Sequence, residues 1–262
     1  MVRLVVSDVD GTLAADGTNK VNPRLFEIIH ELKKKDILFA VASGRQLPSI
    51  ARLFEPVKDN IIFIAENGAY VVCRDTEMSA VPMEREYVKQ LVKEIRQQKQ
   101  CILTMSGRNV TYIESHDEEF VDLLVNGYKN TIQIVDDVLK VDTQVIKIAV
   151  YVKEGITKIA EDYFIPNWNN DLKVVIAGYS WLDFMNKQVD KGNALARIQQ
   201  MTGIKQEETI SFGDNSNDLG MFIHSGKSYA VANAREEVRQ AADCVIGSYK
   251  EESVIKELEK LL

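Results

Sequence analysis

Leu4-Val5-Val6-Ser7-Asp8-Val9-Asp10-Gly11-Thr12 is the stretch that decides the fold. Its apolar run stops at a polar turn, which is typical of a buried strand with carboxylates at its end. An N-cap and a proline at Asn22-Pro23 then predict a helix, and two more apolar runs follow at residues 37–42 and 61–65. Strands that alternate with helices in this way predict βαβ units and a parallel sheet.

The middle of the chain has a different pattern. A charged amphipathic helix is predicted over residues 84–100, and pairs of short strands at hairpin spacing follow it, so we expect a second α/β unit. The last part returns to the first pattern, with a strand at residues 209–212 that ends in Gly213-Asp214. We therefore expect a core made of residues 1–81 and 188–262, with residues 82–187 inserted into it.

The composition is that of an ordinary globular protein and argues against several classes. The 262 residues carry 32 lysines and arginines against 39 aspartates and glutamates, a net charge of −7. An acidic chain without a basic block is a poor candidate for nucleic-acid binding. The three cysteines lack metal-site spacing, and no window approaches the ~18 apolar residues of a membrane span. We expect a cytoplasmic monomer or weak dimer without a membrane or nucleic-acid partner.

Polar clusters follow three of the predicted strands, and a fourth cluster contains Lys191. In open α/β sheets, ligands bind outside the carboxyl ends of the strands. Carboxylates that meet at such an edge repel one another unless a cation lies among them, and oxygen ligands of this kind suit Mg²⁺. A phosphoryl group adds ~1.5–2 negative charges, which the metal, Lys191 and a hydroxyl can balance. The three clusters at the strand ends are Asp8 to Thr12, Ser43-Gly44-Arg45, and Gly213 to Asp218.

These clusters resemble the four motifs of the haloacid dehalogenase superfamily of phosphatases. Two further segments, Asn67-Gly68-Ala69 and Ala232-Asn233-Ala234, resemble signatures of its Cof-type, or class IIB, subfamily. The resemblance covers essentially the whole chain and implies a Rossmann-like parallel-sheet core with an inserted α/β cap. In motif order, the matching positions are Asp-x-Asp-Gly-Thr-Leu at 8–13, Ser43-Gly44-Arg45, Lys191, and Gly213-Asp214-x-x-Asn217-Asp218.

The resemblance also implies a role for each of these residues. Asp8 would be the nucleophile and Asp10 the general acid and base. Mg²⁺ would be held by the Asp8 carboxylate, the main-chain carbonyl of Asp10 and Asp214, while Asp218 would orient Lys191 or metal-bound water. The phosphoryl oxygens would be held by Ser43, the Gly44 amide, Lys191 and Asn217.

Together these inferences predict a Mg²⁺-dependent phosphatase of small phosphorylated metabolites, with sugar phosphates favoured and a cap that closes over the site. The alternatives are a phosphomutase of the same superfamily, a receiver-like module that keeps its aspartyl-phosphate, and a metal-binding scaffold without turnover.

Three local questions also stay open. Ser43-Gly44 is either a phosphate-binding segment or a helix N-cap, or both, and Arg45 contacts substrate or forms a local ion pair. The segment Gly247-Ser-Tyr-Lys-Glu-Glu-Ser253 departs from the family pattern. Whether this segment contacts the site is therefore an open question.

Overall fold

The computed structural model describes residues 1–18 and 20–262, and the chain divides into two compact units. The first, which we call the core unit, consists of Met1–Ser79 and Asp190–Leu262. The second, the insertion unit, consists of Ala80–Val189. Each unit has its own sheet. Across the part of the chain that the structure describes, every helix is too short or too polar to cross a membrane.

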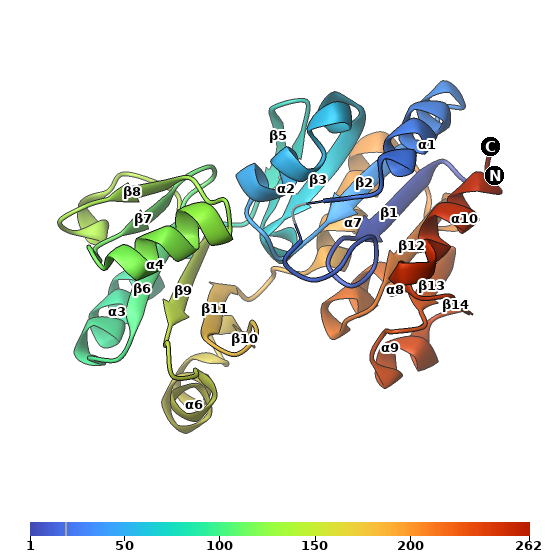
Figure 1. Ribbon diagram of the computed structural model, residues 1–262. Coiled ribbons are helices and arrows are strands. Elements are labelled where there is room, and N and C mark those ends of the chain that lie inside the picture. Colours follow the sequence, from blue (N-terminus) through green and yellow to red (C-terminus); the bar gives the residue numbers. More distant parts are fainter. Residues whose placement is uncertain (19) are drawn as a thin grey trace. The chain divides into compact units, whose positions relative to one another are not determined.

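The core unit is built on one eight-stranded sheet in the order β14-β13-β12-β1-β2-β3-β4-β5. From β14 to β3 every neighbouring pair is parallel, which confirms the predicted α/β class and parallel core. Figure 1 shows the amino-terminal and carboxyl-terminal parts of the chain side by side in this sheet. The strands are β1 (Leu4–Asp8), β2 (Leu38–Ala42), β3 (Ile61–Ala65), β4 (Tyr70–Cys73), β5 (Thr76–Ala80), β12 (Thr209–Gly213), β13 (Lys227–Val231) and β14 (Cys244–Ile246).

Burial of β1 on both faces explains its continuous apolar run. Leu4, Val5 and Val6 are all 0% exposed, as expected for a strand covered by helices on both sides. Leu4 and Val6 belong to a cluster with residues of α7, whereas α1 and α2 pack against β2 and β3. The helices of the core unit are α1 (Pro23–Lys34), α2 (Leu47–Leu53), α7 (Lys191–Thr202), α8 (Leu219–Ile223), α9 (Glu236–Ala241) and α10 (Ser253–Glu259).

The antiparallel edge formed by β4 and β5 is absent from the prediction made from sequence. Strand β4 pairs antiparallel with β3, after a turn in which Glu66 and Asn67 both have positive φ. The apolar run at Tyr70–Cys73 is only four residues long, and such short runs do not distinguish a strand from other buried segments.

The insertion unit has a six-stranded sheet in the order β10-β11-β9-β6-β7-β8. All its pairs are antiparallel except β7 with β8, so the predicted hairpins are present. Helix α3 contributes Leu91, Val92 and Ile95 to the core that this sheet builds. The strands are β6 (Ile102–Ser106), β7 (Thr111–Ile113), β8 (Ile132–Ile134), β9 (Lys147–Tyr151), β10 (Leu172–Ile176) and β11 (Trp181–Asn186). The helices are α3 (Arg85–Gln97), α4 (Glu118–Asp122), α5 (Thr157–Ile159) and α6 (Ile165–Trp168).

Candidate active site

The carboxyl ends of three adjacent parallel strands bring the predicted site residues together. Asp8 is the last residue of β1, Ser43 follows β2, and Asp214 follows β12. Because β1 pairs with both β2 and β12 in parallel, these ends lie at one edge of the sheet. Lys191 is the first residue of α7, and its side chain reaches Asp8 from there. All these residues belong to the core unit.

A buried lysine joins two carboxylates at the centre of this edge. Lys191 Nζ donates to Asp8 Oδ1 at 2.5 Å and to Asp218 Oδ1 at 2.7 Å, and the Lys191 side chain is 0% exposed. Burial alone would lower the pKa of the Lys191 ammonium, but attraction to Asp218 and Asp8 outweighs it and raises that pKa above its usual value. The ammonium therefore stays charged although its side chain is fully buried.

Asp8 has one carboxylate oxygen that Lys191 leaves free. Asp8 Oδ2 is buried and without a hydrogen-bond partner among the described residues. Burial raises the pKa of Asp8 well above its ordinary value, Lys191 opposes this, and repulsion by Asp218 and Asp214 adds to it. Such an oxygen costs free energy unless a ligand or cation binds it, so it is a candidate ligand atom.

The carboxylates fit a divalent cation. Oxygen atoms of Asp8, Asp214 and Asp218 lie within 4.8 Å of one another. Burial, with repulsion from Asp218, raises the pKa of Asp214 to about 6. A bound cation would lower the pKa of Asp214 again, because it offsets the repulsion that disfavours the charged carboxylates. The buried free oxygen of Asp8 and this all-oxygen donor set match what Mg²⁺ and similar hard cations require.

Asp218 is held differently from Asp8 and Asp214. Its Oδ1 accepts from Lys191, and its Oδ2 accepts the backbone N–H groups of Asp214 and Asn215, each at 3.0 Å. Both oxygens are therefore engaged within the protein, and the residue is 0% exposed. This arrangement supports the expected orienting role of Asp218 toward Lys191.

Gly11 makes room for the Asp214 carboxylate. Its backbone has φ +88°, and a Cβ at this position would lie 2.9 Å from Asp214 Cγ and closer still to Asp214 Oδ2. Thr12, the next residue, donates from Oγ1 to Asp214 Oδ1 at 3.0 Å. The turn after Asp10 thus places the Asp214 carboxylate directly, a contact that the sequence analysis did not assign.

Replacing Gly11 by Ala is therefore expected to displace Asp214. We expect the free energy of unfolding to fall by about 1–3 kcal/mol, from the left-handed backbone and the clash together. The dissociation constant for Mg²⁺ should also rise. Urea denaturation and calorimetric titration of Mg²⁺ measure the two effects, with Gly17→Ala as control, because Gly17 also has positive φ but open space around it. If the two variants bind Mg²⁺ equally well, the contact with Asp214 has no consequence for the metal.

Asp10 forms an ion pair with Arg45. Arg45 Nε donates to Asp10 Oδ2 at 2.8 Å, and Arg45 Nη2 donates to Asp10 Oδ1. Arg45 Nη1 also donates to the Thr18 carbonyl at 2.9 Å, and the Gly17 N–H donates to Asp10 Oδ1 at 3.2 Å. Of the two interpretations of Arg45, the structure shows the local ion pair, which ties the loop after β1 to the segment after β2.

Ser43 is not a helix N-cap. Helix α2 begins at Leu47, and its N-cap residue, Gln46, makes no capping bond through its side chain. The N-cap interpretation was therefore wrong, because three residues separate Ser43 from the helix. The Ser43 hydroxyl instead accepts the Arg45 N–H at 3.1 Å and donates to Asp10 Oδ2 at 3.4 Å.

Asn217 and Gly44 meet through a residue to which the sequence analysis assigned no role. Asn217 Nδ2 donates to Asn67 Oδ1 at 2.9 Å, and a Cβ on Gly44 would lie 3.2 Å from the same Asn67 oxygen. Asn67 belongs to one of the subfamily signatures, so the resemblance to the subfamily already singled out this residue. Its partner could not be identified without the fold, because Asn67 and Asn217 are 150 residues apart in the sequence.

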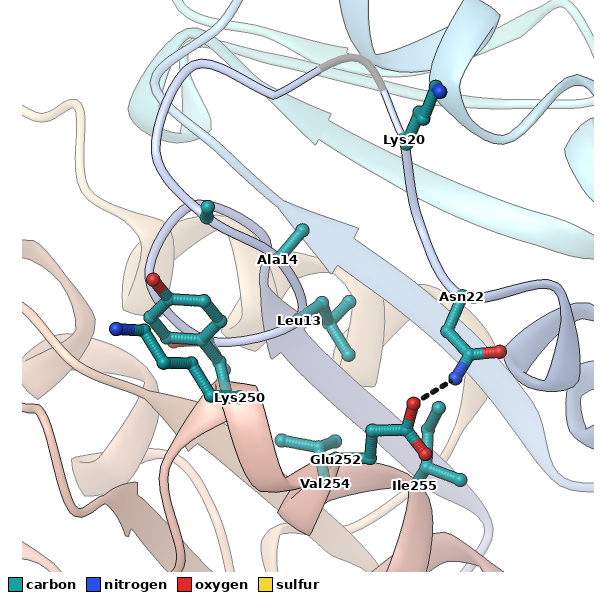
Figure 2. Close-up of a pocket in the computed structure, with 11 residues that line it drawn as sticks. Leu13, Ala14, Lys20, Asn22, Lys250, Glu252, Val254 and Ile255 are labelled. Atoms are coloured by element: carbon teal, nitrogen blue, oxygen red, sulfur yellow. Dashed lines mark hydrogen bonds between the residues drawn. The ribbon is translucent and has the colours of Figure 1, made fainter.

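The divergent carboxyl-terminal segment contacts the loop after β1 through Asn233. The Tyr249 N–H donates to Asn233 Oδ1 at 3.2 Å, and Asn233 Nδ2 donates to the Gly11 carbonyl at 2.8 Å. A cavity of about 210 Å³ lies between this segment and the loop. Figure 2 shows residues that line it, with an Asn22–Glu252 hydrogen bond at its lower edge. The segment that departs from the family pattern thus contacts the site indirectly, through Asn233.

Known proteins resemble this chain over its whole length. A family model of haloacid dehalogenase-like hydrolases matches residues 5–258. The Escherichia coli (strain K12) 5-amino-6-(5-phospho-D-ribitylamino)uracil phosphatase YbjI is 24% identical over 261 residues, covering 100% of this chain and 96% of that protein.

Solved structures also resemble this chain over nearly its whole length. A crystal structure from Eubacterium rectale has a TM-score of 0.93 at 31% identity and covers 100% of this chain and 99% of that one. The HAD subclass IIB sugar phosphatase BT4131 shares the fold, with a TM-score of 0.82 at 24% identity over 99% of both chains. The resemblance read from four short motifs is confirmed over nearly every residue: the chain belongs to the haloacid dehalogenase-like hydrolase family.

Proposed function

We propose that this protein is a Mg²⁺-dependent phosphatase that forms an aspartyl-phosphate on Asp8. The observation that carries the proposal is the Asp8 carboxylate, which is buried, bound to Lys191 through one oxygen and free at the other. Family membership implies a divalent metal ion, and the relatives are phosphatases, so the substrates are small phosphorylated molecules. Asp8, the main-chain carbonyl of Asp10 and Asp214 would hold Mg²⁺, which would supply positive charge beside the phosphoryl oxygens.

The residues around Asp8 provide the rest of the chemistry. An Asp8 oxygen attacks phosphorus in line, the bond from phosphorus to the leaving oxygen breaks, and Asp10 gives that oxygen its proton. Asp10 then takes a proton from water, which attacks the aspartyl-phosphate and restores the Asp8 carboxylate with release of inorganic phosphate. Lys191, the Ser43 hydroxyl, the Gly44 N–H and the Asn217 amide stabilise the charge on the transferred group.

Proton transfer by Asp10 requires that it leave Arg45. The guanidinium offers only donors and occupies both carboxylate oxygens of Asp10. A rotation of the Asp10 side chain would free one oxygen, which would take up a proton from solvent and then give it to the leaving group, while Arg45 keeps its bond to the Thr18 carbonyl. Until that rotation occurs, the ion pair keeps the Asp10 carboxylate bound to Arg45 and away from the leaving group.

Sugar phosphates are the substrate class that we propose. The family resemblance favours them, and the name of the Escherichia coli relative describes a substrate with a phosphorylated ribityl chain. The assignment of residues 82–187 as the cap, with the part it would play in selecting substrate, stays a prediction.

One assay separates the phosphatase from its alternatives. The protein is incubated with an aryl phosphate or a hexose phosphate and Mg²⁺, and free phosphate, sugar isomers and acid-stable phosphoenzyme are measured. We expect many equivalents of phosphate per protein and no isomer. Isomer without phosphate would indicate a phosphomutase, one equivalent of lasting phosphoenzyme a receiver-like module, and complete inactivity across a broad phosphate panel a scaffold.

A further inference from the structure

Asn67 lies between two of the segments that would bind phosphate. It is the middle residue of the short turn Glu66–Gly68 after β3, and it is 8% exposed. Its Oδ1 accepts from Asn217 Nδ2 at 2.9 Å, and its backbone N–H donates to the Ser43 carbonyl at 2.9 Å. A single buried residue thus contacts the segment after β2 and the segment after β12.

The contact with Asn67 determines how the Asn217 amide is presented. Among the described residues, Asn217 Oδ1 is buried without a hydrogen-bond partner, so the bond to Asn67 is what orients this side chain. An amide nitrogen carries two hydrogens. Because Asn67 accepts one of them, the Asn217 nitrogen faces Asn67, and its second N–H is left for a ligand.

The backbone of Asn67 suits this position. Its φ of 56° lies in the left-handed region, which asparagine and glycine adopt more readily than other residues do. This conformation lets the backbone N–H reach Ser43 while the side chain turns to Asn217. Nearly any other side chain would lose either the backbone conformation or the acceptor.

We propose that Asn67 is a positioning residue for the phosphoryl group. Through Oδ1 it fixes the amide of Asn217, and through its N–H it holds the Ser43-Gly44 segment at a set distance from that amide. The inference rests on the proposed function, because it concerns phosphate held by Ser43, Gly44 and Asn217. It predicts that Asn67 acts through Asn217 and does not touch substrate.

The test begins with Asn67→Gly, which removes the acceptor but tolerates the left-handed backbone. We expect kcat/KM for an aryl phosphate to fall about 10-fold, which is the effect of one lost hydrogen bond on a bound anion. The inhibition constant of inorganic phosphate should rise by a similar factor. Asp36→Gly is the matched control, because Asp36 has φ 58° in an exposed turn, and it should leave both values unchanged.

A double-mutant cycle distinguishes positioning from a general structural effect. Adding Asn67→Gly to Asn217→Ala should cause less than about a two-fold further loss, because the group that Asn67 orients is already gone. An independent 10-fold loss in both backgrounds would overturn the proposal, as would wild-type kinetics of Asn67→Gly. A wild-type protein that neither releases phosphate nor binds inorganic phosphate would instead overturn the proposed function, and this inference with it.

Discussion

Replacing Asp8 by Asn is expected to lower kcat at least about a thousand-fold on any phosphate monoester, because the amide cannot form the acyl-phosphate. The exchange is nearly isosteric, so the site keeps its shape. Without metal, we expect the melting temperature to stay the same or to rise, because Lys191 keeps Asp218 as its counter-ion and is not left as an unpaired buried charge. Burial raises the pKa of Asp8 well above its ordinary value, so the folded site favours a neutral group at this position.

The measurement combines steady-state kinetics with acid-quenched mass spectrometry of the peptide that contains Asp8. Wild-type protein should show the added mass of one phosphoryl group on this peptide, and the variant should not. The control is Asp16→Asn, an exposed carboxylate in the loop after β1, which should retain full activity. Substantial turnover by Asp8→Asn would refute the covalent mechanism.

Replacing Lys191 by Met should have the largest effect on stability. The methionine fills a similar volume but leaves Asp8 and Asp218 buried without their cation. Breaking a buried ion pair at one partner costs about 3–5 kcal/mol of unfolding free energy. Activity should fall at least about a hundred-fold as well, since Lys191 stabilises the charge of the transferred group.

The pH dependence of this effect identifies its cause. In the variant without metal, the pKa of Asp8, which burial already raises, rises further because Lys191 no longer opposes the effect of burial. The folded protein then binds protons more readily than the unfolded chain, so stability rises as the pH falls from 7 toward 5. Urea denaturation of metal-free protein at both pH values measures this trend.

Two further variants complete the experiment on Lys191. Lys191→Met combined with Asp218→Asn should recover part of the lost stability, because one unpaired charge is removed. Lys34→Met, at an exposed ion pair on α1, should change the unfolding free energy by less than about 0.5 kcal/mol. A Lys191→Met protein as stable as the wild type would show that the buried pair contributes nothing to folding.

The sequence by itself determined the sheet of the core and the edge that carries the chemistry. Apolar runs that end in Asp8, Ser43 and Asp214 predicted strands whose polar ends meet, because parallel strands share one carboxyl edge. The structure places these residues there. The family was also within reach of sequence, since its motifs are short and contiguous.

Only the tertiary structure decided which side chains contact one another. Arg45 pairs with Asp10, Lys191 lies between Asp8 and Asp218, and Asn67 orients Asn217. These partners are 27 to 183 residues apart in the sequence. Hydrophobic periodicity and turn residues report local conformation, whereas a hydrogen bond depends on ångström-scale distances that packing of the whole sheet and its helices sets.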